Sequence, residues 1–465
     1  MSTTSTSSSL SKDPLIRFGP ILAAVNHSSL IALAQRIRQQ LEKGRMSSID
    51  RTNHKGNRTN VLHYNCTILS SPIYGSYNVL QIIEFSDGLR WIIRIPSTGL
   101  KGQYTIESSA SLQSDALTMR FIKANTTMPI PEVYDFSATT ENDIGAPYIL
   151  MSFLEGFPVY KIWFDESGEV PKQIRRERIL DTIAEAMSQL KKFHFDQIGS
   201  LQFDKSLDPA SIGKCNLVDE YNDLGNLDNK IDEGPKFIQI GPFSSSYNYF
   251  CALLGTQRLP KDSFSIGIHK LLQMMIQCIP PSVSSKESVE AYPLLEKFVL
   301  AHPDAGSQNF LVSKDGVLTG IIDWDGVHTV PHCVGYQKYP SWITRDWDPA
   351  MYGYFRLGCQ AEDSPEALED YRQRYSKTMQ LFVPEYINYT SKSHIFEALQ
   401  IASSSPICMD GIIEKFFHQL FPKEDQEEAE YPMYLYEIAI GLAEDQLDES
   451  VKTRITDAIM NFLKL

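Results

Sequence analysis

The first half of the chain alternates between short apolar runs and turn-forming residues. Residues 78–85 and 91–95 are rich in β-branched and other apolar side chains, and Ser-Asp-Gly at 86–88 separates them. This arrangement predicts a β-hairpin. Apolar residues then recur at helical spacing over residues 109–123, and an apolar run at 148–153 predicts a further strand. The pattern indicates a small lobe made of strands and one helix.

The second half of the chain is dominated by helical periodicity. Apolar side chains recur every three or four residues from Ile179 to Phe193, and similar stripes follow towards the C-terminus. Three short apolar runs interrupt this pattern, at residues 298–300, 309–312 and 317–322. The last two are joined by Lys-Asp-Gly and predict a second hairpin. We therefore expect an α+β fold with a small strand-rich N-lobe and a large, mostly helical C-lobe.

The segment before the first strands has a composition of its own. Residues 1–12 are rich in Ser and Thr and are predicted to be a disordered tail. Residues 13–61 are expected to form an N-terminal helix, with an apolar face over 28–43, and a polar loop at 45–58. The two lobes then follow, with the N-lobe expected at 62–155 and the C-lobe at 156–465.

Composition narrows the range of partners. The chain has 465 residues, of which 42% are hydrophobic, and this allows a core of ordinary density. The 43 Lys and Arg against 57 Asp and Glu give a net charge of −14. Because an acidic chain repels nucleic acid and anionic membranes, we expect neither as a partner. No apolar run has the length needed to cross a bilayer.

Cysteine usage and the N-terminus bear on location. The seven Cys are scattered without a C-x-x-C pair, which favours a reducing compartment over a disulfide framework or a zinc site. The N-terminus lacks the apolar core of a secretory signal, so we predict a cytoplasmic protein. A mitochondrial transit peptide stays an alternative because Arg17, Arg36 and Arg38 lie near the N-terminus, although Asp13 and Glu42 weigh against it.

The strongest chemical pattern surrounds the second predicted hairpin. His302, Asp304 and Asn309 have the form H-x-D-x4-N, and Asp323 and Asp325 follow the second strand as D-x-D. A carboxylate in a loop can orient a hydroxyl and accept its proton, as phosphoryl transfer requires. An amide oxygen and a second carboxylate can hold Mg²⁺, which prefers oxygen ligands. The hairpin would bring Asp323 back beside Asn309, and the pattern therefore indicates phosphoryl transfer.

These motifs resemble those of the aminoglycoside phosphotransferase and choline kinase-like superfamily, especially its fungal branch. The residues Pro-Ile-Pro-Glu-Val at 129–133 resemble the family's I-P-V-P-E-V element, and Gly-Ile-Ile-Asp-Trp at 320–324 resemble its G-I-I-D-W/F element. The likeness extends over roughly residues 62–349. It implies a two-lobed, protein-kinase-like fold that binds ATP between its lobes and phosphorylates a small-molecule hydroxyl.

The resemblance assigns roles to the motif residues by position. Asp304 would be the catalytic base, and Asn309 and Asp323 would hold Mg²⁺, with Asp325 assisting as an outer or water-mediated ligand. His302 belongs to the same catalytic loop, where we expect it to hydrogen-bond the backbone rather than transfer a proton. The implied cofactors are ATP and Mg²⁺.

The resemblance also implies a nucleotide site in the N-lobe. The basic strand residue that contacts the ATP phosphates would be Arg94, where Lys is usual, and its helix partner would be Asp115, where Glu is usual. The longer Arg and the shorter Asp compensate for each other in reach. The phosphate loop would lie around Gly75 and Ser76, with one glycine instead of G-x-G-x-x-G.

The apolar strand near residue 150 would serve as the hinge between the lobes. In this family such a hinge offers backbone groups to adenine, and Met151 and Phe153 would pack against the base.

Two alternatives to a small-molecule kinase stay open. A pseudokinase, acting as a nucleotide-binding or scaffold protein, would fit Arg94 and the single-glycine loop, but it leaves the complete set of Asp304, Asn309 and Asp323 unexplained. A protein kinase is the second alternative, and the absence of an A-P-E motif after Asp323 counts against it. The residues identify neither the phosphate acceptor nor the oligomeric state.

Overall fold

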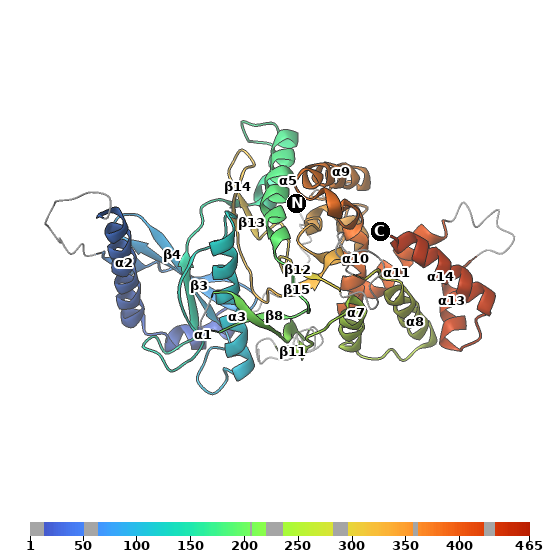
Figure 1. Cartoon of the computed structure of the whole chain (residues 1–465), viewed down its shortest axis with the longest axis horizontal. Coiled ribbons are helices and arrows are strands. Elements are labelled where there is room, and N and C mark those ends of the chain that lie inside the picture. Colours follow the sequence, from blue (N-terminus) through green and yellow to red (C-terminus); the bar gives the residue numbers. More distant parts are fainter. Residues whose placement is uncertain are drawn as a thin grey trace, which may run out of the picture. The chain divides into compact units, whose positions relative to one another are not determined.

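The computed structural model describes residues 14–50, 64–204, 207–219, 236–281, 296–356, 361–422 and 433–465. The chain forms two compact units (Figure 1). The first comprises Met1–Phe121, Pro131–Leu154 and Val218–Phe237, and the second comprises Ile122–Ile130, Glu155–Leu217 and Ile238–Leu465. The predicted tail at 1–12 lies outside the described residues.

The first unit is built on an antiparallel sheet of six strands. They are β1 (Cys66–Ile68), β2 (Ile73–Tyr74), β3 (Asn78–Phe85), β4 (Arg90–Pro96), β5 (Val133–Ser137) and β6 (Tyr148–Ser152). Their order is β1-β3-β4-β6-β5, and β2 pairs with β3 as well. The β3–β4 hairpin turns at 86–88 as predicted, where Gly88 has the positive φ of 83° that the turn requires.

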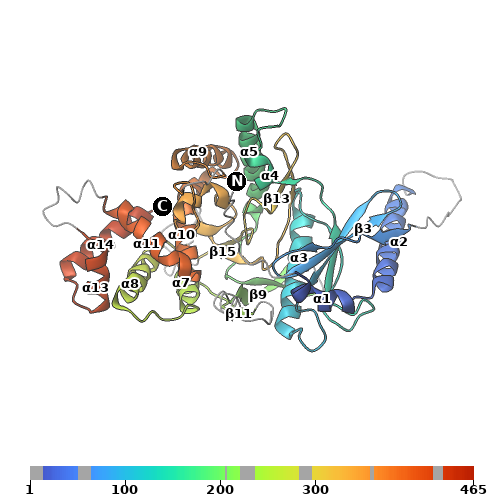
Figure 2. The same cartoon turned by 180° about the vertical axis from the view of Figure 1, so that it is seen from behind.

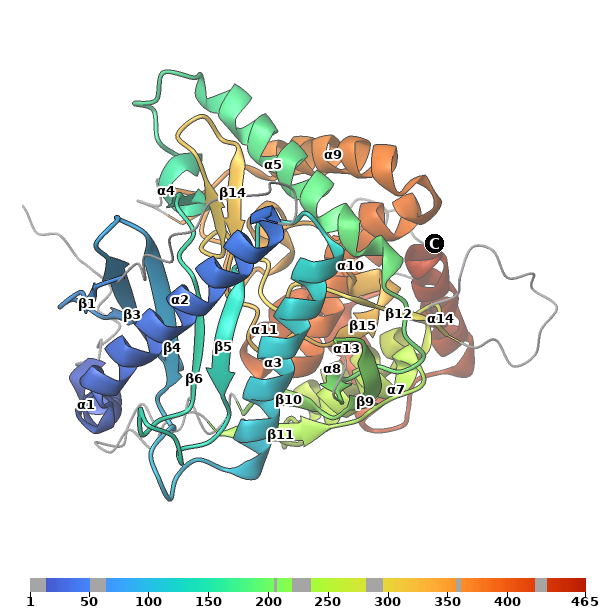
Figure 3. The ribbon, with the colours of Figure 1, turned by 60° about the vertical axis from the view of Figure 1, so that its left-hand side comes forward.

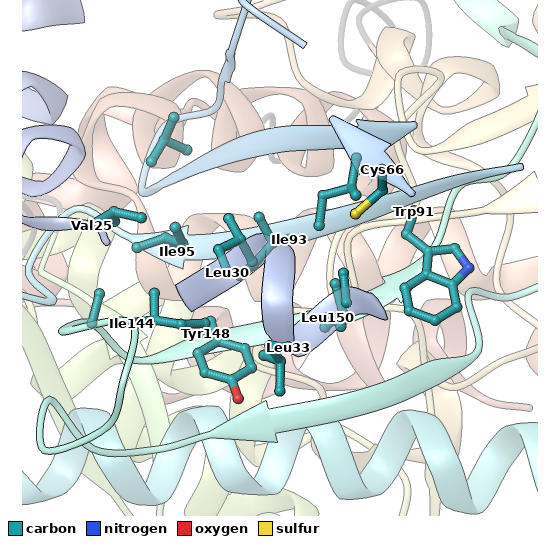
Figure 4. Packing of buried hydrophobic residues seen from close by; sticks show 14 of the residues in the cluster. Val25, Leu30, Leu33, Cys66, Trp91, Ile93, Ile95, Ile144, Tyr148 and Leu150 are labelled. Atoms are coloured by element: carbon teal, nitrogen blue, oxygen red, sulfur yellow. The ribbon is translucent and has the colours of Figure 1, made fainter. Parts of the chain in front are cut away.

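Two helices cover one face of this sheet. They are α1 (Pro14–Ala24) and α2 (His27–Asp50), and Figure 3 shows α2 lying across the strands. Leu30 and Leu33 of α2 belong to the same buried cluster as Trp91, Ile93 and Ile95 of β4 (Figure 4). Because side chains alternate along a strand, Arg94 points to the other face. There it meets Asp115 of α3 (Ile106–Asn125).

The sequence predicted a single helix followed by a loop from residue 45, and this was wrong in two respects. An additional helix, α1, precedes α2, and α2 continues through the residues 45–50 that were expected to be a loop. The polar segment at 45–50 contains no proline, so its polarity does not prevent it from continuing a helix. No single described helix is long and apolar enough to cross a membrane, whereas α1 and the first part of α2, bent by 70°, meet these criteria together.

The second unit is mostly helical. Its α-helices are α4 (Val159–Trp163), α5 (Lys172–Ser188), α7 (Ser246–Gly255), α8 (Ser263–Gln277), α9 (Pro365–Phe382), α10 (Ile387–Ser404), α11 (Pro406–Leu420), α13 (Leu435–Ala443) and α14 (Glu449–Leu463). Helix α5 packs against α9, and α8 packs against α13 (Figure 2). Short 3-10 helices connect them, at η1 (Gln189–Lys192), η2 (His332–Val334), η3 (Ser341–Ile343), η4 (Arg345–Trp347) and η5 (Pro384–Tyr386).

Short strands in the second unit frame the predicted catalytic segment. One sheet has the order β14-β13-β7, formed by β14 (Leu318–Ile321), β13 (Phe310–Val312) and β7 (Phe157–Pro158). Among the described residues, β12 (Phe298–Leu300) also pairs with β15 (Thr329–Pro331), and β8 (Ser200–Phe203) pairs with β9 (Pro209–Gly213). Strand β10 (Cys215–Val218) pairs with β11 (Phe237–Ile240). The predicted α+β class, with a strand-rich N-terminal part and a mostly helical C-terminal part, is confirmed.

Candidate active site

The predicted loop and hairpin form one continuous piece of the second unit. Strand β12 is buried along its whole length and delivers the chain into the loop at 301–309. Strands β13 and β14 then pair with Phe310 opposite Ile321, and the backbone N–H of Ile322 donates to the carbonyl of Asn309 at 2.9 Å. Asp323 is the next residue after Ile322. The hairpin therefore returns Asp323 to the side of Asn309, as the sequence predicted.

Asn309 is bonded to the predicted base. Its side-chain Nδ2 donates to the backbone carbonyl of Asp304 and to Asp304 Oδ2, both at 3.0 Å. Asn309 is buried, whereas the carboxylate of Asp304 is exposed. Since the amide nitrogen makes both of these bonds, the amide oxygen of Asn309 is the side-chain atom that can bind a metal ion.

His302 fixes the loop from beneath. It is only 1% exposed, its Nε2 lies 2.8 Å from the carbonyl of Ile322, and its Nδ1 accepts from the backbone N–H of Asp304 at 3.2 Å. Its ring packs edge-on against Trp324. Burial lowers the pKa of His302 to about 4 and keeps the ring neutral at pH 7. The expected backbone bonding is present, and it ties the loop to the end of β14.

Asp323 has an unusual backbone conformation. Its φ is 63°, in the left-handed region that non-glycine residues seldom adopt and that Asp tolerates better than most. The next residue, Trp324, is buried and donates its indole N–H to the carbonyl of Ile321 at 3.1 Å. This turn leaves Asp323 exposed and Asp325 half-buried. A strained backbone of this kind is typical of a functional position.

The available donors fit a magnesium ion. Asn309 and Asp323 offer an amide oxygen and a carboxylate, which are the hard ligands that Mg²⁺ prefers. Within the described ranges, no three or more His, Cys, Asp or Glu side chains are grouped to hold a metal ion. A site for Mg²⁺ with a nucleotide does not need such a group, because the phosphates and water supply the remaining ligands.

In the first unit, Arg94 and Asp115 form the predicted ion pair. Nη2 of Arg94 lies 3.8 Å from Oδ2 of Asp115, and the two side chains are 9% and 8% exposed. The hydroxyl of Tyr104 lies in the same environment, and burial is the main cause that raises its pKa above the usual value. Buried charges of this kind require a partner. The pair is therefore confirmed, while its contact with a nucleotide stays a prediction.

The predicted phosphate loop is the turn of a hairpin. Tyr74 of β2 pairs with Val79 of β3, and the N–H of Gly75 donates to the carbonyl of Asn78 at 2.9 Å. Both Gly75 and Ser76 are exposed, and the carbonyl of Ser76 accepts from Arg17 at 2.5 Å.

The two predicted hinge residues differ in their surroundings. Met151 is buried within β6, where it pairs with Ile92 and Val133 on the neighbouring strands. Phe153 follows β6 and is half-buried, its N–H donates to the carbonyl of Arg90 at 3.3 Å, and the Arg90 guanidinium lies 4.3 Å from the centre of its ring. Phe153 thus lies just beyond the end of β6, whereas Met151 lies within this strand.

Sequence reasoning missed the residues that hold the catalytic loop from outside its motif. Ser341 donates its N–H to the carbonyl of Ala305 at 3.1 Å, and Glu397 of α10 bonds both Lys338 and Thr344 around this segment. Glu397 lies far from the loop in sequence, so no local pattern could reveal this contact. Sequence reasoning also missed Gln308, which lies inside the motif and contacts Asp304.

Comparisons with known proteins find similar fungal proteins. The Subtelomeric hrmA-associated cluster protein of Aspergillus fumigatus (strain CBS 144.89) is 32% identical over 334 residues, which are 60% of this chain and 61% of that protein. The mitochondrial protein Altered inheritance of mitochondria protein 9 of Meyerozyma guilliermondii is 25% identical over 54% of this chain and 37% of its own length. The matches therefore span less than two thirds of these relatives.

Among solved structures, a macrolide 2'-phosphotransferase type I is similar with a TM-score of 0.37 and 13% identity, over 76% of this chain and 91% of that one. Residues 82–331 match the model of the Phosphotransferase enzyme family, and this range contains the predicted catalytic loop, the β13–β14 hairpin and Asp323. Because the match covers more than half of the sequence, this chain, which has an α+β fold, belongs to the Phosphotransferase enzyme family.

Proposed function

We propose that the protein is an ATP- and Mg²⁺-dependent phosphotransferase that moves the γ-phosphoryl group to a hydroxyl of a small-molecule acceptor. The proposal is carried by the arrangement of Asp304, Asn309 and Asp323. Asn309 is bonded to Asp304 at 3.0 Å, and β13–β14 pairing returns Asp323 to its side. The proposed base and the two proposed metal ligands would thereby be held by one loop and one hairpin.

The residues would divide the chemistry between them. Asp304 would orient the acceptor hydroxyl and accept its proton as the oxygen bonds to the γ-phosphorus and the bond to the ADP oxygen breaks. Asn309 and Asp323 would bind Mg²⁺, with Asp325 as an outer ligand. The ion, when bound, would neutralise charge on the phosphates. His302 would keep the loop in place, because its buried neutral ring is bonded to backbone at both nitrogens.

The first unit would supply the nucleotide contacts. We propose that Arg94, held by Asp115, contacts the phosphates, and that Gly75 and Ser76 form an exposed turn beside them, with Ser76 offering its backbone N–H. Met151 and Phe153 would lie near adenine. Of the two, Phe153 is the better candidate for stacking because it is not fully buried.

A pseudokinase is the second candidate function. It is favoured by Arg94, since a guanidinium engaged by a buried carboxylate at 3.8 Å is bulkier at the phosphates than the usual Lys. Such a protein would bind ATP without transferring phosphate. The two functions differ in turnover and not in nucleotide binding.

We propose a cytoplasmic location, with mitochondria as the alternative because one relative is named as mitochondrial. Expression of the full chain with a C-terminal fluorescent tag distinguishes the two.

The proposed function is tested by exposing purified protein to a cellular metabolite pool with ATP labelled by ¹⁸O in its γ-phosphoryl group. We expect one or a few metabolites to gain the mass of a labelled phosphoryl group, and Asp304→Asn to abolish this gain. Labelled product that forms equally with Asp304→Asn would contradict Asp304 as the base. ATP binding without any labelled product would favour the pseudokinase.

A further inference from the structure

A second side chain contacts the carboxylate of Asp304. Nε2 of Gln308 donates to Asp304 Oδ2 at 2.7 Å, which is the same oxygen that accepts from Asn309 at 3.0 Å. Within the described part of the chain, no group donates to Oδ1. The two carboxylate oxygens are therefore different: one is held by two amides, and the other faces no competing donor.

The Gln308 side chain is also packed against the loop. A methyl group added at Gly306 would lie 2.5 Å from both the nitrogen and the oxygen of the Gln308 amide. Gly306 is buried and has no positive φ, so its backbone would accept another residue. A side chain at this position would therefore displace the flexible, exposed end of Gln308, whose amide folds back over Gly306 to reach Asp304.

We propose that Gln308 is a positioning residue for phosphoryl transfer: together with Asn309 it holds Oδ2 of Asp304, so that Oδ1 receives the proton of the acceptor hydroxyl. This inference rests on the proposed function. Asp304 is exposed, and an exposed carboxylate without such bonds would rotate freely. Two donors on one oxygen fix its orientation before the acceptor binds, and this reduces the entropy that must be lost in the transition state.

Gln308 and Asn309 would contribute differently. Asn309 joins the base to the metal, so its loss should impair both Mg²⁺ binding and turnover. Among the described residues, the Gln308 side chain hydrogen-bonds the proposed base alone. Its loss should therefore reduce kcat while the KM for ATP and the Mg²⁺ requirement stay unchanged. This difference separates positioning of the base from general damage to the site.

The contact itself can be observed without any activity, by NMR of protein labelled with ¹⁵N at glutamine. The Gln308 side-chain signal is identified by its loss in Gln308→Ala. We expect it to shift in Asp304→Ala and in Gly306→Ala, and to stay in place in Gln173→Ala, which alters an exposed Gln-to-Glu bond of 3.2 Å on α5. An unmoved signal in Asp304→Ala and Gly306→Ala would overturn the contact, whether or not the protein is a kinase.

The role is tested by kinetics of the same variants. Gln308→Ala should lower kcat by about tenfold to a hundredfold, the effect of losing a hydrogen bond to a charged group. Gln308→Glu should lower it further, because a second negative charge beside Asp304 repels the carboxylate. Gly306→Ala should act like Gln308→Ala, and the double variant should be no worse than either alone, since removing the amide makes room for the methyl group.

Three kinetic results would contradict this role: a normal kcat in Gln308→Ala, additive losses in the double variant, or a raised KM for ATP with kcat unchanged. If the wild-type protein transfers no phosphate at all, the proposed function fails instead, and the NMR result still decides whether Gln308 holds Asp304.

Discussion

The individual residues of the predicted sites differ in whether they are buried or exposed. His302 is enclosed by Trp324 and backbone groups and stays neutral, whereas Arg94 and Asp115 are buried side by side as an ion pair. Asp304 and Asp323 are exposed, as the proposed contacts with an acceptor and a metal ion require. Exposure thus distinguishes the residues proposed to act in the chemistry from those that support the structure.

The buried imidazole of His302 makes stability depend on pH. Its pKa is about 4 in the folded protein, below the ordinary 6.5, so the unfolded chain binds a proton in the window between these values while the folded protein does not. Stability therefore falls as pH falls through this window. Urea unfolding at pH 7 and pH 5 should show a loss that is smaller in His302→Gln by about 2 kcal/mol.

His332 and His394 also have lowered pKa values because they are buried, so the wild-type protein should lose more than this one contribution. An equal loss in wild type and His302→Gln would show that His302 is accessible to protons in the folded state.

The Arg94–Asp115 pair should behave as a unit. Arg94→Ala or Asp115→Ala leaves one buried charge without its partner and should cost about 3 kcal/mol of stability and weaken ATP binding. The double variant should cost clearly less than the sum of the two. Unfolding and calorimetric ATP titration of the four proteins give the coupling.

The exposed pair of Lys101 and Glu141, at 2.8 Å, is the matched control, and we expect its coupling to be too small to measure. Additive effects of Arg94→Ala and Asp115→Ala would mean that these two residues do not interact.

At the scale of elements, the β13–β14 hairpin brings together Asn309 and Asp323, which are separated in sequence, at the candidate site. Both hairpins were predictable, because apolar alternation and Asp-Gly turns are local signals. Local signals also predicted that His302, Asp304 and Asn309 share one loop. The extension of α2 and the contact of Glu397 with Lys338 and Thr344 were not predictable, since the first lacks an apolar pattern and the second joins segments far apart in sequence.

The turn of the hairpin provides a test of its contribution. Gly316 has φ 85°, and an added methyl group would lie 2.6 Å from the carbonyl oxygen of Arg175. Gly88, in the β3–β4 turn, has a similar φ of 83° but open space around it. Gly88→Ala should therefore cost about 1 kcal/mol from backbone strain alone. Gly316→Ala should cost about 1–3 kcal/mol more from the clash.

Since the Gly316 turn joins Asn309 to Asp323, Gly316→Ala should also weaken Mg²⁺-dependent ATP binding, and Gly88→Ala should not affect the metal. Thermal unfolding with and without ATP·Mg²⁺ measures both effects. Equal stability losses in the two variants would argue against close packing of this turn on α5.

At the scale of the whole molecule, the chain combines a sheet-based unit with a helical one, and the predicted site residues are divided between them. The first carries Arg94 and Asp115, and the second carries the loop with Asp304, Asn309 and the neighbouring Asp323. The fold class was readable from the sequence because strands and helices are segregated along the chain. The packing of α1 and α2 into the core of the first unit was not, because it depends on contacts with strands that follow much later.

Binding of ATP should depend on the metal in this molecule. ATP with Mg²⁺ at about a hundred times its dissociation constant should stabilise the folded protein by roughly 2–3 kcal/mol. ATP with EDTA should stabilise it less, and Asp323→Asn should respond alike to both. Thermal scans of both proteins under these two conditions, compared with scans without ATP, measure this. No shift in wild type under either condition would exclude both the kinase and the nucleotide-binding pseudokinase.

The most direct test of the account compares ATP turnover of the wild-type protein with that of Asp304→Asn, at matched ATP·Mg²⁺ occupancy. Asn keeps the size of Asp but cannot accept the hydroxyl proton, and Asp304 needs no contact with the nucleotide. We expect ATP affinity to change little and turnover, whether to acceptor or to water, to fall by roughly 10²–10⁴. Turnover that Asp304→Asn leaves intact would contradict the assignment of this loop as the catalytic site.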